Sequence, residues 1–172
     1  MIQTLRKRLS RKDEGFTLIE LMVVVLIIAI LLAIAIPTFL GARGRAQAKA
    51  AESNLRNALT ASKTGFTDNQ TYYGASSVSA LSAIEPALNW VTATSSLTVG
   101  GNTVYVANAE SGASVCLQDE GANSTFYAVF DETGTGAGTY YSSSTAAIAC
   151  PTSAPTVGTA SGWYSTPSAA GW

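Results

Sequence analysis

The sequence contains no histidine. Histidine is the side chain most often used for proton transfer near neutral pH and for metal binding, so hydrolytic and zinc-dependent mechanisms lose their usual key residue. Neither a carboxylate pair nor an activated serine stands in a recognised catalytic setting. We therefore expect no enzyme activity, no cofactor and no metal site.

Basic residues are missing from the back of the chain. All ten Lys and Arg residues lie before residue 64, whereas residues 64–172 carry seven acidic residues. Neutralising a nucleic-acid backbone requires basic residues. We therefore expect no direct nucleic-acid binding by this region.

Four of these acids form two adjacent pairs, Asp119-Glu120 and Asp131-Glu132. Carboxylates are calcium ligands, but the spacing of these pairs matches no defined calcium-binding loop. We interpret all four as solvated turn residues.

Cysteine is also scarce, because Cys116 and Cys150 are the only two in the chain. An even number in a polar region is typical of a structural disulfide formed in an oxidising compartment. Two free, buried thiols are the alternative.

A long apolar run dominates the front of the chain. Residues 16–40 include a single charged side chain, Glu20, and the run is long enough to cross a bilayer. The preceding residues 1–15 hold five basic residues against two acidic ones, which favours a cytoplasmic location for that end.

Three interpretations compete for this run. A secretory signal would be cut near Ala33-Ile34-Ala35, but its apolar part is usually about 7 to 15 residues, and this run is longer. A plain membrane anchor explains the apolarity and leaves Glu20 unexplained, since a charge inside a bilayer usually has a function.

The third interpretation rests on Gly15-Phe16-Thr17-Leu18-Ile19-Glu20-Leu21. This segment, after a short basic leader and before an unbroken apolar run, resembles the prepilin cleavage and methylation motif of type IV pilins and type II secretion pseudopilins. The resemblance extends from Lys12 to about Lys63. It implies an α+β type IV pilin fold, with a long N-terminal helix packed on a four- or five-stranded antiparallel sheet.

The resemblance also implies a processing reaction. A membrane peptidase would cut after Gly15 and methylate the new amino group of Phe16. Glu20 would then pair with that amino group, within one subunit or between neighbouring subunits during assembly.

The resemblance divides the chain into four segments. These are a cytoplasmic leader (1–15), a membrane-spanning assembly helix (16–40), an amphipathic helix that packs on the head (41–65), and an extracytoplasmic head with a disulfide-bounded C-terminal region (66–172). Pro37, Gly41 and Gly44 predict a helix kink, either a simple bend at the membrane exit or a site that loosens on assembly.

The amphipathic part places Ala48, Leu55 and Leu59 on one face, and Gly65 is a plausible helix stop. Glu52 lies elsewhere on the helix and forms a favourable pair with Arg56 four residues later.

The head is expected to contain a short helical piece at 78–88 and then strands. Residues 96–99 and 103–107 flank Gly100-Gly101-Asn102 and predict a hairpin. Further strands are expected at 113–118, 125–131 and 139–143. The tail after Cys150 is expected to pack across the sheet; subunit contacts and an adhesive aromatic patch are alternatives.

The predicted function is that of a structural subunit. It would form a homopolymer with other pilin subunits in a surface filament that serves adhesion, motility or DNA uptake. Its partners would be the prepilin peptidase and methyltransferase, the inner-membrane assembly platform with its ATPases, and membrane lipid before assembly. A type II secretion pseudopilin, and a minor pilin or membrane-tethered binding module, are the alternatives.

Overall fold

The computed structural model describes residues 15–73, 77–108 and 112–172. The leader up to residue 14 and Gly74, which the sequence places in a turn after Tyr72-Tyr73, lie outside the described residues. The chain divides into two compact units, residues 1–41 and 42–172.

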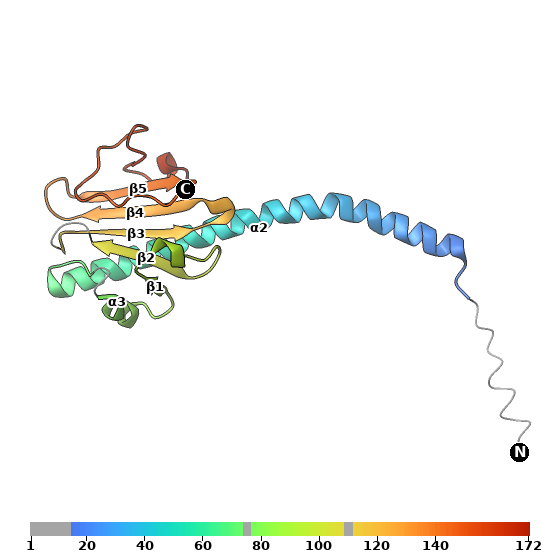
Figure 1. Cartoon of the computed structure of the whole chain (residues 1–172), viewed down its shortest axis with the longest axis horizontal. Coiled ribbons are helices and arrows are strands. Elements are labelled where there is room, and N and C mark those ends of the chain that lie inside the picture. Colours follow the sequence, from blue (N-terminus) through green and yellow to red (C-terminus); the bar gives the residue numbers. More distant parts are fainter. Residues whose placement is uncertain (1–14, 74–76, 109–111) are drawn as a thin grey trace, which may run out of the picture. The chain divides into compact units, whose positions relative to one another are not determined.

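Helix α2 (Leu18–Asn69) is 52 residues long (Figure 1). It contributes to both units, begins two residues later than expected and passes through Gly65, so the predicted stop at Gly65 is wrong. Gly65 is buried, and a Cβ atom there would lie 2.7 Å from Cδ2 of Tyr73. The glycine therefore permits close packing rather than ending the helix.

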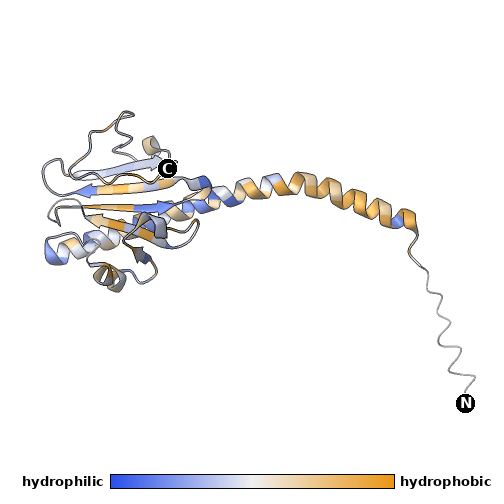
Figure 2. Ribbon diagram, in the orientation of Figure 1, coloured by the Kyte–Doolittle hydropathy of each residue, from blue (hydrophilic) through white to orange (hydrophobic). Residues whose placement is uncertain are grey.

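The first unit contains the apolar part of α2. Figure 2 shows apolar residues along this part of the helix. By length and composition, α2 is the one helix among the described residues that could cross a membrane.

The second unit contains a five-stranded sheet with the strand order β1-β2-β3-β4-β5. The strands are β1 (Asn89–Val91), β2 (Thr103–Asn108), β3 (Ser114–Glu120), β4 (Phe126–Glu132) and β5 (Gly138–Ser144). β1 pairs parallel with β2, and the other neighbours are antiparallel. The predicted α+β fold is thus confirmed, with a sheet that is mostly antiparallel.

The predicted hairpin around Gly100-Gly101-Asn102 is wrong. Residues Thr94–Ser96 form a 3₁₀ turn, and the strand that pairs with β2 at this edge of the sheet is β1 instead. Trp90 explains the choice: its side chain is buried, and its indole N–H donates to the Glu85 carbonyl over 3.3 Å. Burial of this large side chain places β1 in the sheet and leaves 92–102 as the connection to β2.

The main core lies between α2 and one face of the sheet. Its buried members include Ala51, Leu55, Ala58 and Ala61 from the helix and Val104, Val106, Val115, Leu117 and Val129 from the strands. Helix α3 (Val78–Ile84) adds Leu81 to the core. It is shorter than the expected piece at 78–88 and ends before Pro86, because the residue before a proline disfavours the helical conformation.

The opposite face of the sheet is covered by the C-terminal tail. Cys116, Ala128, Phe130 and Trp163 form a second buried cluster there. Cys116 and Cys150 are joined in a disulfide, and Tyr164 exchanges two backbone hydrogen bonds of 2.8 Å with Tyr141 of β5. The tail therefore packs on the sheet, as the sequence led us to expect.

Candidate functional site

The start of α2 is organised by Thr17 and Glu20. The backbone N–H and the hydroxyl of Thr17 donate to Glu20 Oε2 over 2.9 and 2.7 Å, and the Glu20 N–H donates to Thr17 Oγ1 over 3.3 Å. This reciprocal arrangement is a capping box, which satisfies backbone donors that a helix start leaves free. The Glu20 carboxylate is thereby held beside the first turn of the helix.

Thr17 was missed as a functional candidate by the sequence reasoning. The signal was present, because a Thr followed three residues later by Glu, directly before an apolar run, is the pattern of a capping box. Thr17 therefore joins Glu20 in the candidate site.

The predicted cleavage position lies just before this cap. Gly15, Phe16 and Thr17 precede the helix, and the Phe16 side chain is 85% exposed. A Cβ atom added to Gly15 would meet nothing within 4 Å. Packing within the described part of the chain therefore does not require glycine at this position.

The apolar side chains that follow are uncovered in the single chain. Large apolar residues from Leu18 to Leu40 are between 46% and 74% exposed. Apolar surface on this scale is not stable in water and indicates a membrane or protein interface.

Helix α2 continues through Pro37, Gly41 and Gly44. The hydroxyl of Thr38 donates to the carbonyls of Ile34 and Ala35 over 3.1 and 2.9 Å. These bonds add donors beside Pro37, which has no backbone N–H of its own. The kink at these positions stays a prediction.

Glu52 occupies a different place from the one expected. Its side chain is buried against the head rather than lying on the exposed surface of the helix. Lys49 Nζ lies 2.8 Å and Arg56 Nη2 3.5 Å from its carboxylate. The expected pairing with Arg56 is present, and the two cations compensate the buried charge.

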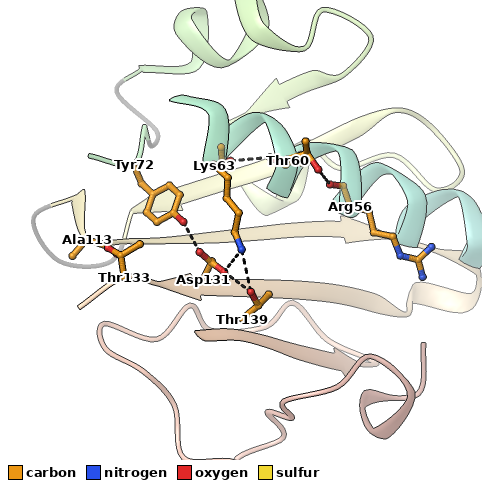
Figure 3. Close-up of polar contacts among 10 residues, drawn as sticks. Arg56, Thr60, Lys63, Tyr72, Ala113, Asp131, Thr133 and Thr139 are labelled. Atoms are coloured by element: carbon orange, nitrogen blue, oxygen red, sulfur yellow. Dashed lines mark hydrogen bonds and ion pairs between the residues drawn. The ribbon is translucent and has the colours of Figure 1, made fainter. Parts of the chain in front are cut away.

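Asp131 is the centre of a second polar cluster (Figure 3). Lys63 Nζ lies 3.0 Å from Asp131 Oδ1, the Thr139 hydroxyl donates to the same oxygen, and the Tyr72 hydroxyl donates to Oδ2. Burial and the hydrogen bond to Asp131 raise the pKa of Tyr72. The cluster connects α2 to β4, β5 and the segment after α2.

Asp119 is a buried acid on β3 without an ion pair among the described residues. Asn54 Nδ2 donates to Asp119 Oδ2 over 2.8 Å, and the Glu120 N–H donates to Oδ1 over 2.7 Å. Burial raises the pKa of Asp119 to about 7.

The interpretation of these acids as solvated turn residues is therefore wrong: Asp119, Asp131 and Glu132 are buried in strands, and Glu120 is the half-buried last residue of β3. Because side chains alternate along a strand, Asp119 and Asp131 point toward α2. There Asn54 donates a hydrogen bond to Asp119, and Lys63 forms an ion pair with Asp131. Among the described residues, no group of three or more His, Cys, Asp or Glu side chains could hold a metal ion.

Comparison with known proteins bears on the front of the chain. Residues 10–36 match the family model described as the prokaryotic N-terminal methylation motif. The chain is 46% identical over 65 residues to the type IV major pilin protein PilA of Myxococcus xanthus, covering 38% of this chain and 30% of PilA.

A second relative is the type IV wide pilus major component PilA4 of Thermus thermophilus. Here the identity is 44% over 62 residues, covering 36% of this chain and 47% of PilA4. The chain thus spans less than half the length of these curated relatives, and no solved structure matches it significantly.

The matched region coincides with the part of the chain that holds the Gly15-Phe16 bond, the Thr17–Glu20 cap and the exposed apolar helix. The chain therefore carries the N-terminal methylation motif of type IV pilins and is homologous, over its N-terminal part, to type IV major pilins.

Proposed function

We propose that this protein is a structural subunit of a type IV pilus-like surface filament. A prepilin peptidase cuts after Gly15 and methylates the amino group of Phe16. The processed chain polymerises through α2 with the help of a membrane assembly platform and its ATPases. Before assembly, the same helix anchors the chain in the cytoplasmic membrane, with the leader inside and the head outside.

The exposed apolar surface of α2 is the observation that carries this proposal. A helix whose large side chains from Leu18 to Leu40 are 46% to 74% exposed needs an apolar environment. Lipid supplies it in the precursor, and neighbouring copies of the same helix supply it in a filament. The similarity to major pilins over this region favours the second arrangement as the end state.

Two local features support the processing step. The Gly15–Phe16 bond precedes the helix, and glycine at position 15 has no packing role in the described chain. We infer that the glycine there serves an external partner that closes around the backbone. Cleavage at this bond leaves the capping box between Thr17 and Glu20 intact.

The role of Glu20 can be separated into charge and helix capping. Glutamine also serves at this position of a capping box, whereas valine does not. Glu20→Gln thus removes the charge and keeps the cap, while Glu20→Val removes both. If Glu20 pairs with a neighbouring amino terminus, both variants are processed but absent from filaments.

The test is intact-mass measurement and N-terminal sequencing of protein sheared from the surface of cells that make the chain. We expect subunits that begin with methylated Phe16 in the wild type and none in sheared material from either variant. Assembly of Glu20→Gln at the wild-type level would assign Glu20 a capping role only. An uncut chain that remains in the membrane would contradict the proposed function.

A further inference from the structure

The exposed surface of α2 in the second unit carries the basic residues of that unit. Arg43, Arg45, Lys49, Arg56 and Lys63 are all solvent-exposed. Lys49 and Arg56 share the carboxylate of Glu52, and Lys63 pairs with Asp131. Arg43 and Arg45 have no ion pair within the described part of the chain. At 100° per residue their side chains lie about 160° apart around the helix, so they are two separate uncompensated charges at one level of α2.

The position of these two arginines along the chain suggests what they bind. Arg43 and Arg45 follow Leu40, the end of the apolar run, by three and five residues. In a helix this corresponds to about 4.5 and 7.5 Å beyond the apolar part. The polar headgroup layer on each side of a bilayer's hydrocarbon core is about 5 to 7.5 Å thick. Both guanidinium groups therefore reach the depth of the lipid phosphates.

We propose that Arg43 and Arg45, on opposite sides of α2, each bind anionic lipid headgroups in the leaflet that faces the head. This inference rests on the membrane-inserted stage of the proposed function. Arginine suits the site because its planar group donates two parallel hydrogen bonds to a phosphate and keeps its charge at any physiological pH. The inference does not depend on which side of the membrane the head occupies.

The charge distribution explains why this contact is local. No basic residue follows Lys63, and residues 64–172 carry seven acids, so the rest of the head is repelled by an anionic surface. Attraction at Arg43 and Arg45 with repulsion beyond them fixes the depth of the helix in the bilayer. On assembly these contacts are lost, and lipid is exchanged for protein.

Arg56 provides a control for net charge, although it differs from Arg43 and Arg45 in pairing with Glu52. At 100° per residue it lies within about 20° of Arg45 on the helix surface, so the two arginines share a flank. Like Arg43 and Arg45, Arg56 is solvent-exposed, but it lies about 24 Å beyond Leu40 along the helix, outside the headgroup layer. Substituting it changes net charge by the same amount per residue without touching the proposed site.

The experiment uses the full chain reconstituted in vesicles with the head outward. Spin-labelled phosphatidylglycerol or phosphatidylcholine is added to the outer leaflet only, which excludes contacts with the leader on the inner side. Electron paramagnetic resonance then measures the motionally restricted fraction of each lipid, and their ratio gives the selectivity for the anionic lipid.

A basic residue near an anionic surface contributes up to about fivefold in association. We expect selectivity for phosphatidylglycerol in the wild type, its loss at high salt and in Arg43→Gln/Arg45→Gln, and its retention in Arg56→Gln. Equal selectivity in the wild type and the double variant would overturn the proposal. So would an equal loss in Arg56→Gln, which would assign the effect to net charge.

Two controls keep the result interpretable. Fluorescence of the buried Trp90 and Trp163 reports whether the head of each variant is folded. The measurement needs an inserted chain but no filament, so it can succeed when assembly fails. A wild-type chain that restricts neither lipid has not inserted, which contradicts the membrane stage itself as well as the site.

Discussion

Asn54 and Asp119 meet across the contact between α2 and β3, where the side-chain amide of Asn54 donates to the buried carboxylate over 2.8 Å. Asn54 also donates to the carbonyl of Gly101 over 2.8 Å, so one amide holds both the acid and the turn before β2. The two other acids that α2 helps to bury, Glu52 and Asp131, have cationic partners. Asp119 has hydrogen bonds alone, and this difference makes it sensitive to pH.

The stability of the head is expected to fall as pH rises from about 4 to about 7. Burial raises the pKa of Asp119 from 3.8 to about 7 in the folded chain. Over that interval the unfolded chain releases this proton and the folded chain retains it, which favours unfolding. The contribution is complete below pH 4 and lost above pH 7. Thermal unfolding followed by circular dichroism across this range measures it.

Asp119→Asn is the matched variant for that prediction, since it keeps the shape and cannot ionise. The melting temperature of this variant, relative to that of the wild type, should increase as pH rises from 4 to 8. A pH slope identical to that of the wild type would show that other groups cause the dependence.

The cluster around Asp131 should respond unequally to the loss of its two charged members. Lys63→Met leaves the carboxylate buried with only hydroxyl partners, and it should lower the free energy of unfolding by about 1 to 3 kcal/mol. Asp131→Ala removes hydrogen bonds from three groups at once and should cost more than Lys63→Met. Urea unfolding of both variants measures the difference.

Lys63→Arg serves as the control in this series, because it retains the charge. It should fall between Lys63→Met and the wild type. If Lys63→Met and Lys63→Arg both unfold at the same urea concentration as the wild type, the ion pair with Asp131 contributes nothing to stability.

The two glycines of α2 in the second unit should respond to alanine in opposite directions. In a helix, alanine is more favourable than glycine by about 1 kcal/mol. At Gly44 the new Cβ would lie 3.6 Å from Cβ of Ala122, an ordinary contact, so Gly44→Ala should raise stability. At Gly65 it would lie 2.7 Å from Cδ2 of Tyr73, so Gly65→Ala should lower it by about 1 to 3 kcal/mol.

Melting temperatures of these two variants, measured side by side, test the assignment. Gly65→Ala at or above the wild-type value would mean that the Tyr73 ring moves aside freely. Lower stability of Gly44→Ala would instead support a bend at Gly44 that alanine resists.

The C-terminal tail is attached to β3 by two neighbouring contacts. Cys116 forms the disulfide with Cys150, and the Gln118 side chain accepts from the Ile148 N–H over 3.1 Å and donates to its carbonyl. Replacing both cysteines by serine should lower the free energy of unfolding by about 3 to 4 kcal/mol, the loop-entropy value for a link of this length. Urea unfolding under non-reducing conditions measures the loss.

Gln118→Ala is the partner experiment, because it removes the amide and leaves the disulfide. We expect a loss of about 1 to 3 kcal/mol and earlier proteolysis after residue 144. A tail that stays protease-resistant in Gln118→Ala would show that the disulfide, Trp163 and the Tyr141–Tyr164 bridge suffice to hold it.

Much of the fold could be predicted from local patterns. The long helix followed from an apolar run that turns amphipathic, and β3, β4 and β5 followed from short segments rich in β-branched and aromatic residues between turns. The hairpin prediction failed because the turn signal at Gly100-Gly101 does not show which strand pairs with β2. In the structure that strand is β1, which contains the buried Trp90. Gly65 failed as a stop for the same reason, since its role depends on Tyr73.

The sequence by itself determined the proposed N-terminal site, because the candidate cleavage bond, the helix cap and the apolar run all involve residues that are adjacent in the chain. Gly15, Phe16 and Glu20 are therefore predictable from the sequence alone, and Thr17 carries the sequence pattern of a capping box. Only the tertiary structure decided the fate of the charged residues in the head. Glu52, Asp119 and Asp131 are acidic residues that nevertheless lie buried. Their desolvation is compensated by partners that can be distant in the chain, such as Lys63 for Asp131.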